Sequence, residues 1–272
     1  MVKFPKLTTS ELIKRLTPPT GKVRLVLDTD TYNEIDDQFA VVHALLSPDN
    51  LTLESIHAAP FSNSRSKNPA DGMEKSYQEA LSLLGRLDVE PKGLVYRGST
   101  AYLDNLENPQ ESEATDNLIK QAMVSDDLNP LYVVAIGAIT NVATAILLEP
   151  TIIEKIVVVW LGGHAHYWPD TLEFNLRQDI NASKLIFDCG VPLVQIPCAG
   201  VAANQIGFDK RIFIGLKHDD YDDGENEENK KDKPEVIGNP NADNYEFYIN
   251  PQIDYCTKKS IQEGEEGCLS IP

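Results

Sequence analysis

The sequence predicts an α/β fold: an open, mostly parallel sheet with helices on both faces, followed by a β-rich C-terminal segment. Three observations support this prediction. Short runs rich in Val, Ile and Leu alternate with amphipathic segments over the first two-thirds of the chain. These runs are apolar on both faces, as in parallel strands that helices cover on both sides. The alternation stops after Pro197, and the apolar runs beyond it have no helical segments between them.

Six strands and five helices are expected in the first part of the chain. The strand runs, among them VRLVL and LYVVAI, lie at 23–27, 51–58, 93–96, 131–136, 156–161 and 191–196. Apolar residues at helical spacing predict helices between them at 36–46, 73–86, 115–123, 141–148 and 182–188. Ser47-Pro48 and Gly85 mark the ends of the first two helices. Strict alternation implies right-handed crossovers between parallel strands.

A domain boundary is expected near residue 198, between an α/β domain (1–198) and a second segment (199–272). The second segment contains apolar runs at 211–216 and 245–249, which predict strands. An acidic insertion at 218–235 has almost no apolar residues, so we expect it to be solvated and disordered.

Composition restricts the class of protein. The 272 residues carry a formal net charge of -18, which argues against nucleic-acid and anionic-membrane partners because both would be repelled. The four cysteines lie far apart, as expected of reduced thiols rather than a disulfide framework. Charged residues interrupt the first twenty positions, and no apolar run is long enough to span a bilayer. We therefore expect a cytoplasmic protein.

An acidic cluster follows the first predicted strand. It consists of Asp28, Asp30, Glu34, Asp36 and Asp37, five carboxylates within ten residues. Such a cluster repels itself unless a cation or several donors compensate it. In open α/β sheets, ligands bind at the carboxyl ends of strands, and oxygen-only ligands favour a hard cation. The alternative for Asp36 and Asp37 is that they only stabilise the N-terminus of a helix.

The segment DTDTYNEIDDQFA (28–40) resembles the N-terminal motif of inosine/uridine-type nucleoside hydrolases. Three later segments resemble that family in the same order. They are AIGAITN (135–141), WLGG (160–163), and EFN (173–175) followed by Asp179. The resemblance spans about residues 23–198. It implies an enzyme that hydrolyses the N-glycosidic bond of ribonucleosides, and it suggests a homo-oligomer.

The resemblance also implies roles for individual residues. Asp30 and Asp37 would hold Ca²⁺ together with the backbone carbonyl of Thr140, and Asp30 would be the general base toward water. The residues expected to bind the ribose hydroxyls are Asp36, Asn63, Glu173 and Asn175. Carboxylates near the ring would stabilise the positive charge that develops on the sugar. Asp28 would shape the site.

A loop rich in histidine and aromatic residues, GGHAHYWPD (162–170), precedes the EFN segment. His164 or His166 could protonate the leaving base, and Trp168 could stack against it. The alternative is a loop whose aromatic residues only pack and whose histidines are exposed. A His-x-His metal site has no third His or nearby Cys to support it.

The last seventy residues resemble a second family. GVAANQIG (200–207), INP (249–251) and EGCLS (266–270) resemble motifs of peptide deformylases, which implies roles for Gln205 at the oxyanion and Cys268 as an Fe²⁺ or Zn²⁺ ligand. The HExxH motif of that family is absent, so its metal site would be incomplete. The expected organisation is the front of one enzyme joined to part of another, by gene fusion or by a truncated or misassembled reading frame. Two alternatives to nucleoside hydrolysis follow: peptide deformylation, or non-catalytic binding of Ca²⁺ or ribose.

Overall fold

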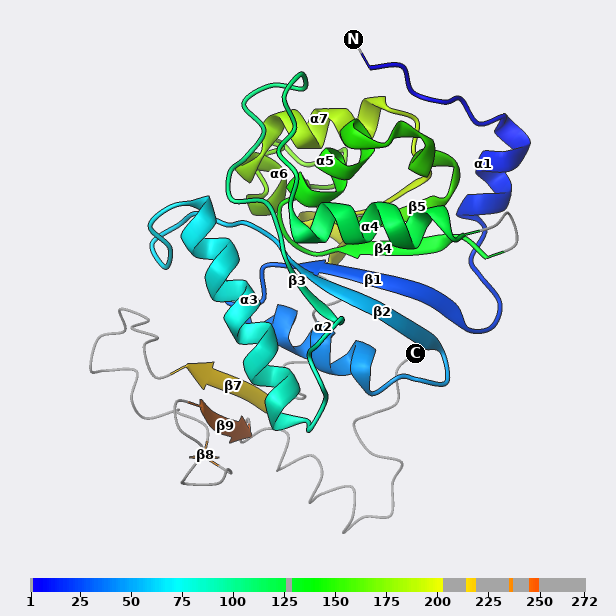
Figure 1. The fold of residues 1–272 in the computed structure, drawn as a ribbon. Helices are drawn as coiled ribbons and strands as arrows, with labels where there is room; N and C mark the ends of the chain where they lie inside the picture. Colours follow the sequence, from blue (N-terminus) through cyan, green and yellow to red (C-terminus); the bar gives the residue numbers. More distant parts are fainter. Residues whose placement is uncertain (1, 126–128, 203–213, 219–234, 237–244, 250–272) are drawn as a thin grey trace. The chain divides into compact units, whose positions relative to one another are not determined.

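The computed structural model describes residues 2–125, 129–202, 214–218, 235–236 and 245–249 (Figure 1). The chain divides into two units, Met1–Ala202 and Ala203–Pro272. Within the described ranges, no helix is both long and apolar enough to cross a membrane.

The first unit is built on a six-stranded sheet in which all neighbouring strands are parallel. Its strands are β1 (Val23–Thr29), β2 (Leu51–Ala58), β3 (Val95–Arg97), β4 (Leu131–Ala135), β5 (Ile156–Leu161) and β6 (Leu193–Ile196). They lie in the order β3-β2-β1-β4-β5-β6. The chain therefore places β2 and then β3 on one side of β1, and afterwards places β4, β5 and β6 in turn on its other side. The point where this order reverses, between β1 and β4, is where open α/β sheets bind ligands.

Helices cover both faces of this sheet (Figure 1). The helices are α1 (Thr9–Leu16), α2 (Ile35–Leu45), α3 (Pro69–Arg86), α4 (Glu113–Met123), α5 (Thr140–Leu148), α6 (Phe174–Gln178) and α7 (Ile180–Asp188). Two short turns, η1 (Pro150–Glu154) and the π-helical η2 (Cys198–Ala202), complete the unit. Helices α2 and α3 lie on one face, and α4, α5 and α7 lie on the other. The predicted α/β class with an open parallel sheet is confirmed.

The second unit has three short antiparallel strands in its described residues. They are β7 (Ile214–His218), β8 (Glu235–Val236) and β9 (Tyr245–Ile249), in the order β7-β9-β8. Most of the predicted acidic insertion lies outside the described residues.

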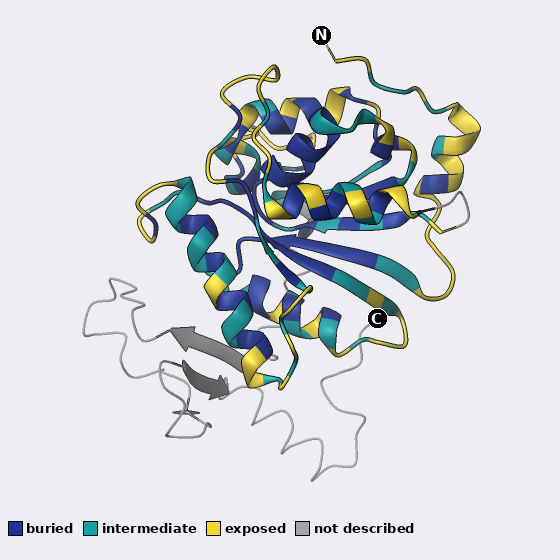
Figure 2. Cartoon of the chain, viewed as in Figure 1, coloured by how far each residue is buried: buried dark blue, intermediate teal, exposed yellow. Residues whose placement is uncertain are grey.

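The strands are buried because helices cover both sides of them, as Figure 2 shows. The largest fully buried side chain is Trp160 in β5, whose Nε1 donates to the carbonyl of Gly137 at 3.1 Å. This indole ties β5 to the loop that follows β4. A Cβ built on Gly162 would lie 2.3 Å from the Trp160 ring, so only glycine fits there.

Two glycines of α3 provide a matched test of packing. A Cβ built on Gly72 would lie 2.0 Å from the carbonyl oxygen of Phe61, whereas one on Gly85 would meet nothing within 4 Å. We expect Gly72→Ala to lower the free energy of unfolding by about 1–3 kcal/mol. Gly85→Ala should raise it by up to about 1 kcal/mol through helix propensity. Urea denaturation of both variants tests this, and equal effects would contradict the packing.

A second stability prediction concerns His57, a fully buried residue of β2. Its Nε2 lies 2.9 Å from Asn117 Oδ1 and 3.0 Å from Ser55 Oγ. Burial disfavours the charged imidazolium and lowers the pKa of His57 to about 4. The unfolded chain therefore takes up this proton first as the pH falls from about 6.5 to about 4, and the folded state loses stability over that range.

Between pH 7 and pH 4.5 we expect this loss to be about 2–3 kcal/mol in the native protein and absent in His57→Gln. Buried carboxylates with raised pKa values change stability in the opposite direction, but they are common to both proteins and cancel in the difference. Urea denaturation at the two pH values measures it. An identical pH dependence in the two proteins would show that His57 does not resist protonation.

Candidate active site

The acidic loop, residues 30–34 between β1 and α2, lies where the strand order reverses. Strand β1 places Asp28 and Thr29 at its carboxyl end, and Asp30 follows directly. The backbone N–H of Ile136 donates to the carbonyl of Asp28 at 2.8 Å, which holds the ends of β1 and β4 together. A Cβ built on Gly137 would lie 2.8 Å from Asp30 Oδ1, so the backbone after β4 passes directly against this carboxylate.

Asp30 and Asp37 are brought together and buried, with 1% and 4% of their surface exposed. Thr29 Oγ1 donates to Asp37 Oδ1 at 2.5 Å, which joins the end of β1 to the first turn of α2. Asp30 Oδ2 is buried and has no hydrogen-bond partner in the part of the chain that the structure describes. Burial raises the pKa of both carboxyls well above its usual range, and repulsion from neighbouring carboxylates, Asp36 among them, raises it further.

Helix capping does not account for this cluster. Glu34 is the N-cap residue of α2, but its side chain makes no capping hydrogen bond. Asp36 and Asp37 do lie in the first turn, where a helix favours negative charge. Capping gives no reason, however, to bury Asp30 beside them. The negative charge of the cluster therefore has to be balanced by a group outside the helix.

Asp28 is held in place by Asn141 in α5. Asn141 Nδ2 donates to Asp28 Oδ2 at 2.8 Å and to the carbonyl of Ala58 at 3.2 Å, and its Oδ1 accepts from the Ser99 N–H at 2.7 Å. One amide thus holds β1, β2 and the loop after β3. Burial raises the pKa of Asp28 to about 7, and the Asn141 hydrogen bond opposes that shift.

Glu173 and Asn175 lie beside the acidic loop, and their side chains also form hydrogen bonds to backbone groups of the protein. The Glu173 carboxylate accepts from the backbone N–H groups of Gly163, Asn175 and Leu176 at 2.8–2.9 Å. Asn175 Nδ2 donates to the carbonyls of Ile136 and Leu161 at 2.9 and 3.0 Å, at the ends of β4 and β5.

The remaining predicted ribose ligands are Asn63, in the loop after β2, and Asp36, in the first turn of α2. Asn63 Nδ2 donates to Asn33 Oδ1 at 2.7 Å, so it reaches the loop that carries the carboxylates. Asp36 is half-buried, and its charge raises the pKa values of Asp30, Glu34 and Asp37.

Thr140 is the first residue of α5, and its hydroxyl donates to Asp179 Oδ2 at 2.9 Å. In that position its backbone carbonyl accepts from the N–H four residues later in the helix. The carbonyl of Ile136 lies outside the helix, at the end of β4 and immediately before Gly137. Because a carbonyl oxygen has two lone pairs, the Asn175 bond leaves the Ile136 carbonyl able to accept again.

The two histidines of the aromatic loop differ in their contacts. His164 is half-buried, and its Nδ1 accepts from the backbone N–H of Ala199 at 3.2 Å. His166 is exposed, and its Nε2 lies 3.2 Å from Gln195 Oε1. Because Gln195 Nε2 donates to the carbonyl of Gly162, its Oε1 is the acceptor, so His166 Nε2 carries a proton. Trp168 is 43% exposed, with its ring centroid 6.1 Å from that of His164.

Two residues near the site, Tyr102 and Cys198, were not identified from the sequence. Tyr102 donates to Gln178 Oε1, and burial followed by the nearby charges of Asp30 and Asp179 raises its pKa. Cys198 is close enough to Glu173 and other carboxylates of the site for their charge to add to the effect of burial in raising its pKa. Tyr102 lies in an irregular loop, where no periodic pattern signals a contact with Asp30. The deformylase-like residues Gln205 and Cys268 lie outside the described residues.

Comparison with known proteins gives the family. A sequence model of the inosine-uridine preferring nucleoside hydrolase family matches residues 25–250. The match thus continues past residue 198 into the segment compared above with peptide deformylases, and the deformylase resemblance finds no support.

Several curated relatives are named as pyrimidine-specific ribonucleoside hydrolases. The chain is 28% identical over 191 residues to a pyrimidine-specific ribonucleoside hydrolase RihA from Enterobacter sp. (strain 638), covering 62% of this chain and 58% of that protein. It is 32% identical over 90 residues to a putative pyrimidine-specific ribonucleoside hydrolase RihB from Shigella boydii serotype 4, covering 32% of this chain and 36% of that one. The chain therefore spans little more than half the length of such relatives.

Among solved structures, the fold is similar to a purine-preferring ribonucleoside hydrolase from Gardnerella vaginalis. The TM-score is 0.50 at 24% identity, over 64% of this chain and 60% of that one. It is also similar to the type III effector protein XopQ, with a TM-score of 0.51 at 18% identity, over 71% and 64% of the two chains. At these identities the likeness concerns the fold alone. The family match, which covers most of the chain, establishes that this protein belongs to the inosine-uridine preferring nucleoside hydrolase family.

Proposed function

We propose that this protein hydrolyses the N-glycosidic bond of ribonucleosides to ribose and free base, with a calcium ion bound at Asp30 and Asp37. One observation carries the proposal: the two carboxylates are buried together where the strand order reverses, and Asp30 Oδ2 has no hydrogen-bond partner among the described residues. A buried carboxylate oxygen without a donor is costly unless a ligand compensates it.

The donor chemistry fits a hard cation. The charged side chains around Asp30, those of Glu34, Asp36 and Asp37, offer oxygen ligands, which suit Ca²⁺ better than zinc. In the described part of the chain, no group of three or more His, Cys, Asp or Glu residues is arranged to hold a metal. Backbone carbonyls, water and sugar hydroxyls would therefore complete the six to eight oxygen ligands that Ca²⁺ takes. We favour the Ile136 carbonyl over that of Thr140, because Ile136 directly precedes Gly137, whose backbone passes against Asp30 Oδ1.

The residues of this chain would act on the sugar and on water. When bound, the cation would lower the pKa values of the adjacent groups and orient the sugar hydroxyls. Asp30 would accept the proton of the attacking water. Asp36 and Glu173 would place negative charge near the ring as positive charge develops on the sugar. Asn63 and Asn175 would help to bind the ribose hydroxyls.

Departure of the base requires a proton. We assign that role to His166 rather than His164, because His166 is exposed whereas His164 Nδ1 already accepts a backbone hydrogen bond. In the neutral tautomer that Gln195 selects, His166 Nδ1 is the nitrogen that can take up and donate a proton. Trp168, on the same loop, is exposed enough to stack against the base.

Chromatographic detection of free base and reducing sugar, after incubation with inosine and with uridine in the presence of calcium, tests the proposal. We expect both products in equal amounts without added phosphate, since water is the nucleophile. Within the described ranges, no third His, Cys, Asp or Glu side chain joins Asp30 and Asp37 in a metal-binding group, which favours a second candidate, a non-catalytic calcium- or ribose-binding protein. Thermal stabilisation by calcium without any product would support that candidate and contradict hydrolysis.

A further inference from the structure

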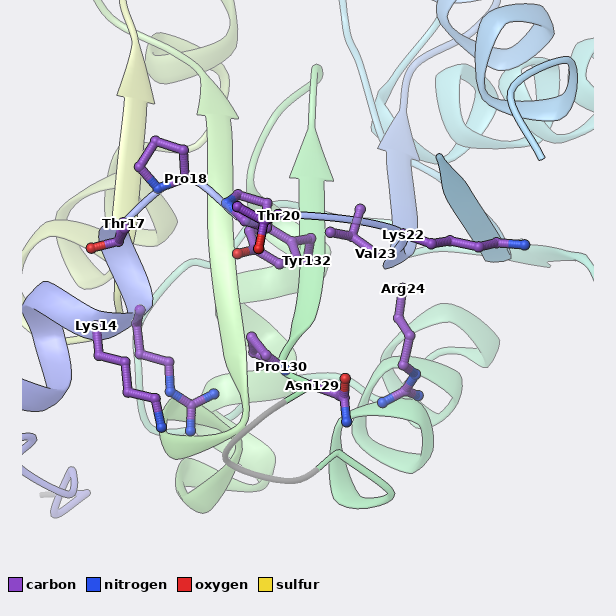
Figure 3. Close-up of a pocket in the computed structure, with 12 residues that line it drawn as sticks. Lys14, Thr17, Pro18, Thr20, Lys22, Val23, Arg24, Asn129, Pro130 and Tyr132 are labelled. Carbon is purple, nitrogen blue, oxygen red and sulfur yellow. The ribbon is translucent and has the colours of Figure 1, made fainter. Parts of the chain in front are cut away.

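A cavity of about 270 Å³ lies at the amino-terminal ends of the strands, whereas the acidic loop lies at their carboxyl ends. It is lined by the start of β1, the start of β4 and the C-terminal end of α1 (Figure 3). These are the amino ends of the strands, whereas Asp30 and Asp37 lie at the carboxyl ends. The cavity is therefore separate from the candidate active site.

The cavity lining has the opposite charge to the protein as a whole. Its charged residues are Lys14, Arg15, Lys22 and Arg24, and none of the described residues that line it is acidic. The whole chain has 42 acidic and 24 basic residues. In a chain with this balance, four cations around one cavity mark a local site for an anion.

The four cations have different surroundings. Arg24 binds Glu54 through two hydrogen bonds, of 2.5 and 2.8 Å, so its charge is offset and it forms a wall of the cavity. Arg15 is buried, and its Nη2 donates to the carbonyl of Glu154 at 2.7 Å. Lys14 and Lys22 are exposed, and neither forms an ion pair with a carboxylate in the described ranges.

Figure 3 shows that Lys14 and Asn129 extend toward the same side of the cavity, whereas Lys22 extends away from them. Lys14 is thus placed to donate a hydrogen bond to a bound group, and Lys22 adds positive charge at the rim. Pro18, Pro19 and Pro130 give the lining a stiff backbone, and Tyr132 adds an aromatic surface. A ligand with an anionic group and a small uncharged part would match this combination.

We propose that this cavity binds a small phosphorylated molecule, with Lys14 as the main ligand of the phosphate group. A phosphate dianion offers several acceptor oxygens and gains more from clustered cations than a single carboxylate does. The volume is that of roughly nine water molecules in the liquid, enough for a phosphate carrying a sugar of pentose size. The formal net charge of -18 of the whole chain argues against a nucleic acid, whose many phosphates it would repel.

Titration calorimetry with inorganic phosphate, ribose 5-phosphate and ribose, at constant ionic strength and with a calcium chelator, tests this. We expect saturable binding of both phosphates at one site, and none of ribose there. Lys14→Gln should weaken phosphate binding about tenfold, because a charge-assisted hydrogen bond is lost. The control Lys92→Gln changes an exposed lysine that does not line the cavity, and it should leave the affinity unchanged.

Phosphate binding should also persist in Asp37→Asn, because Asp37 lies at the carboxyl ends of the strands, away from the cavity. Three results would overturn the proposal: no saturable binding up to about 10 mM phosphate, equal weakening by Lys14→Gln and Lys92→Gln, or loss of binding in Asp37→Asn. None of them bears on nucleoside hydrolysis, so the two proposals stand or fall separately.

Discussion

Replacing Asp37 with asparagine is expected to lower the rate of base release from inosine or uridine by about 10²- to 10³-fold while leaving the fold intact. Asparagine has nearly the same shape as aspartate, and its carbonyl oxygen can still accept the hydrogen bond from Thr29. What the substitution removes is one of the two buried negative charges that we assign to the cation. Steady-state measurement of base release gives the activity, and circular dichroism checks the fold.

Calcium should affect the thermal stability of Asp37→Asn differently from that of the native protein. Because the folded-state pKa of Asp37 is raised, the native protein loses stability as the pH rises through that pKa. Without calcium at pH 8, Asp37→Asn should therefore be at least as stable as the native protein. With calcium, only the native protein should gain stability. Asp49→Asn, at an exposed position, is the control and should behave as native. Full activity in Asp37→Asn would contradict its assignment as a cation ligand.

Replacing Asn141 with alanine should have the largest effect on stability, a loss of about 3–5 kcal/mol in the free energy of unfolding. The side chain makes three buried hydrogen bonds, to Asp28, Ala58 and Ser99. Its removal leaves a buried carboxyl, a carbonyl and an N–H without partners. Such a loss is a large part of the 5–15 kcal/mol that stabilises a typical domain.

Urea denaturation at neutral pH measures this effect. The control is Asn50→Ala, an exposed asparagine whose side chain makes no hydrogen bond in the structure, which should change stability by less than about 0.5 kcal/mol. A loss below about 1 kcal/mol in Asn141→Ala would mean that water or rearrangement satisfies these groups, and that Asn141 does not hold the site together.

The strands were predictable because both of their faces are buried, which requires continuous apolar runs such as Ile156–Leu161. Strand β1 is longer than predicted, because Asp28 and Thr29 continue it with polar side chains that the site, rather than the core, requires. Helix α1 was missed because charged residues interrupt it and only Arg15 is buried. Helix α6 was missed because it has only five residues, which is too short for a helical period to show.

In the candidate site, the sequence pointed to the acidic loop but not to the contacts that arrange it. Asp30 and Asp37 are close in sequence, so a local pattern was enough to pair them. The contact between Asn141 and Asp28 joins residues 113 apart in the sequence, and no periodicity encodes it. The backbone carbonyl of Ile136, next to Gly137, could not be identified as a ligand from the sequence, because every residue has a backbone carbonyl. Its place emerges only when β1 and β4 lie side by side.

The rate of base release from inosine as a function of free calcium concentration tests most directly whether the acidic loop is a cation site that serves hydrolysis. We expect a rate that saturates with calcium, falls to background with chelator, recovers when calcium is restored, and stays at background in Asp37→Asn. Base release that is unaffected by chelator, or equal in the native protein and Asp37→Asn, would contradict it.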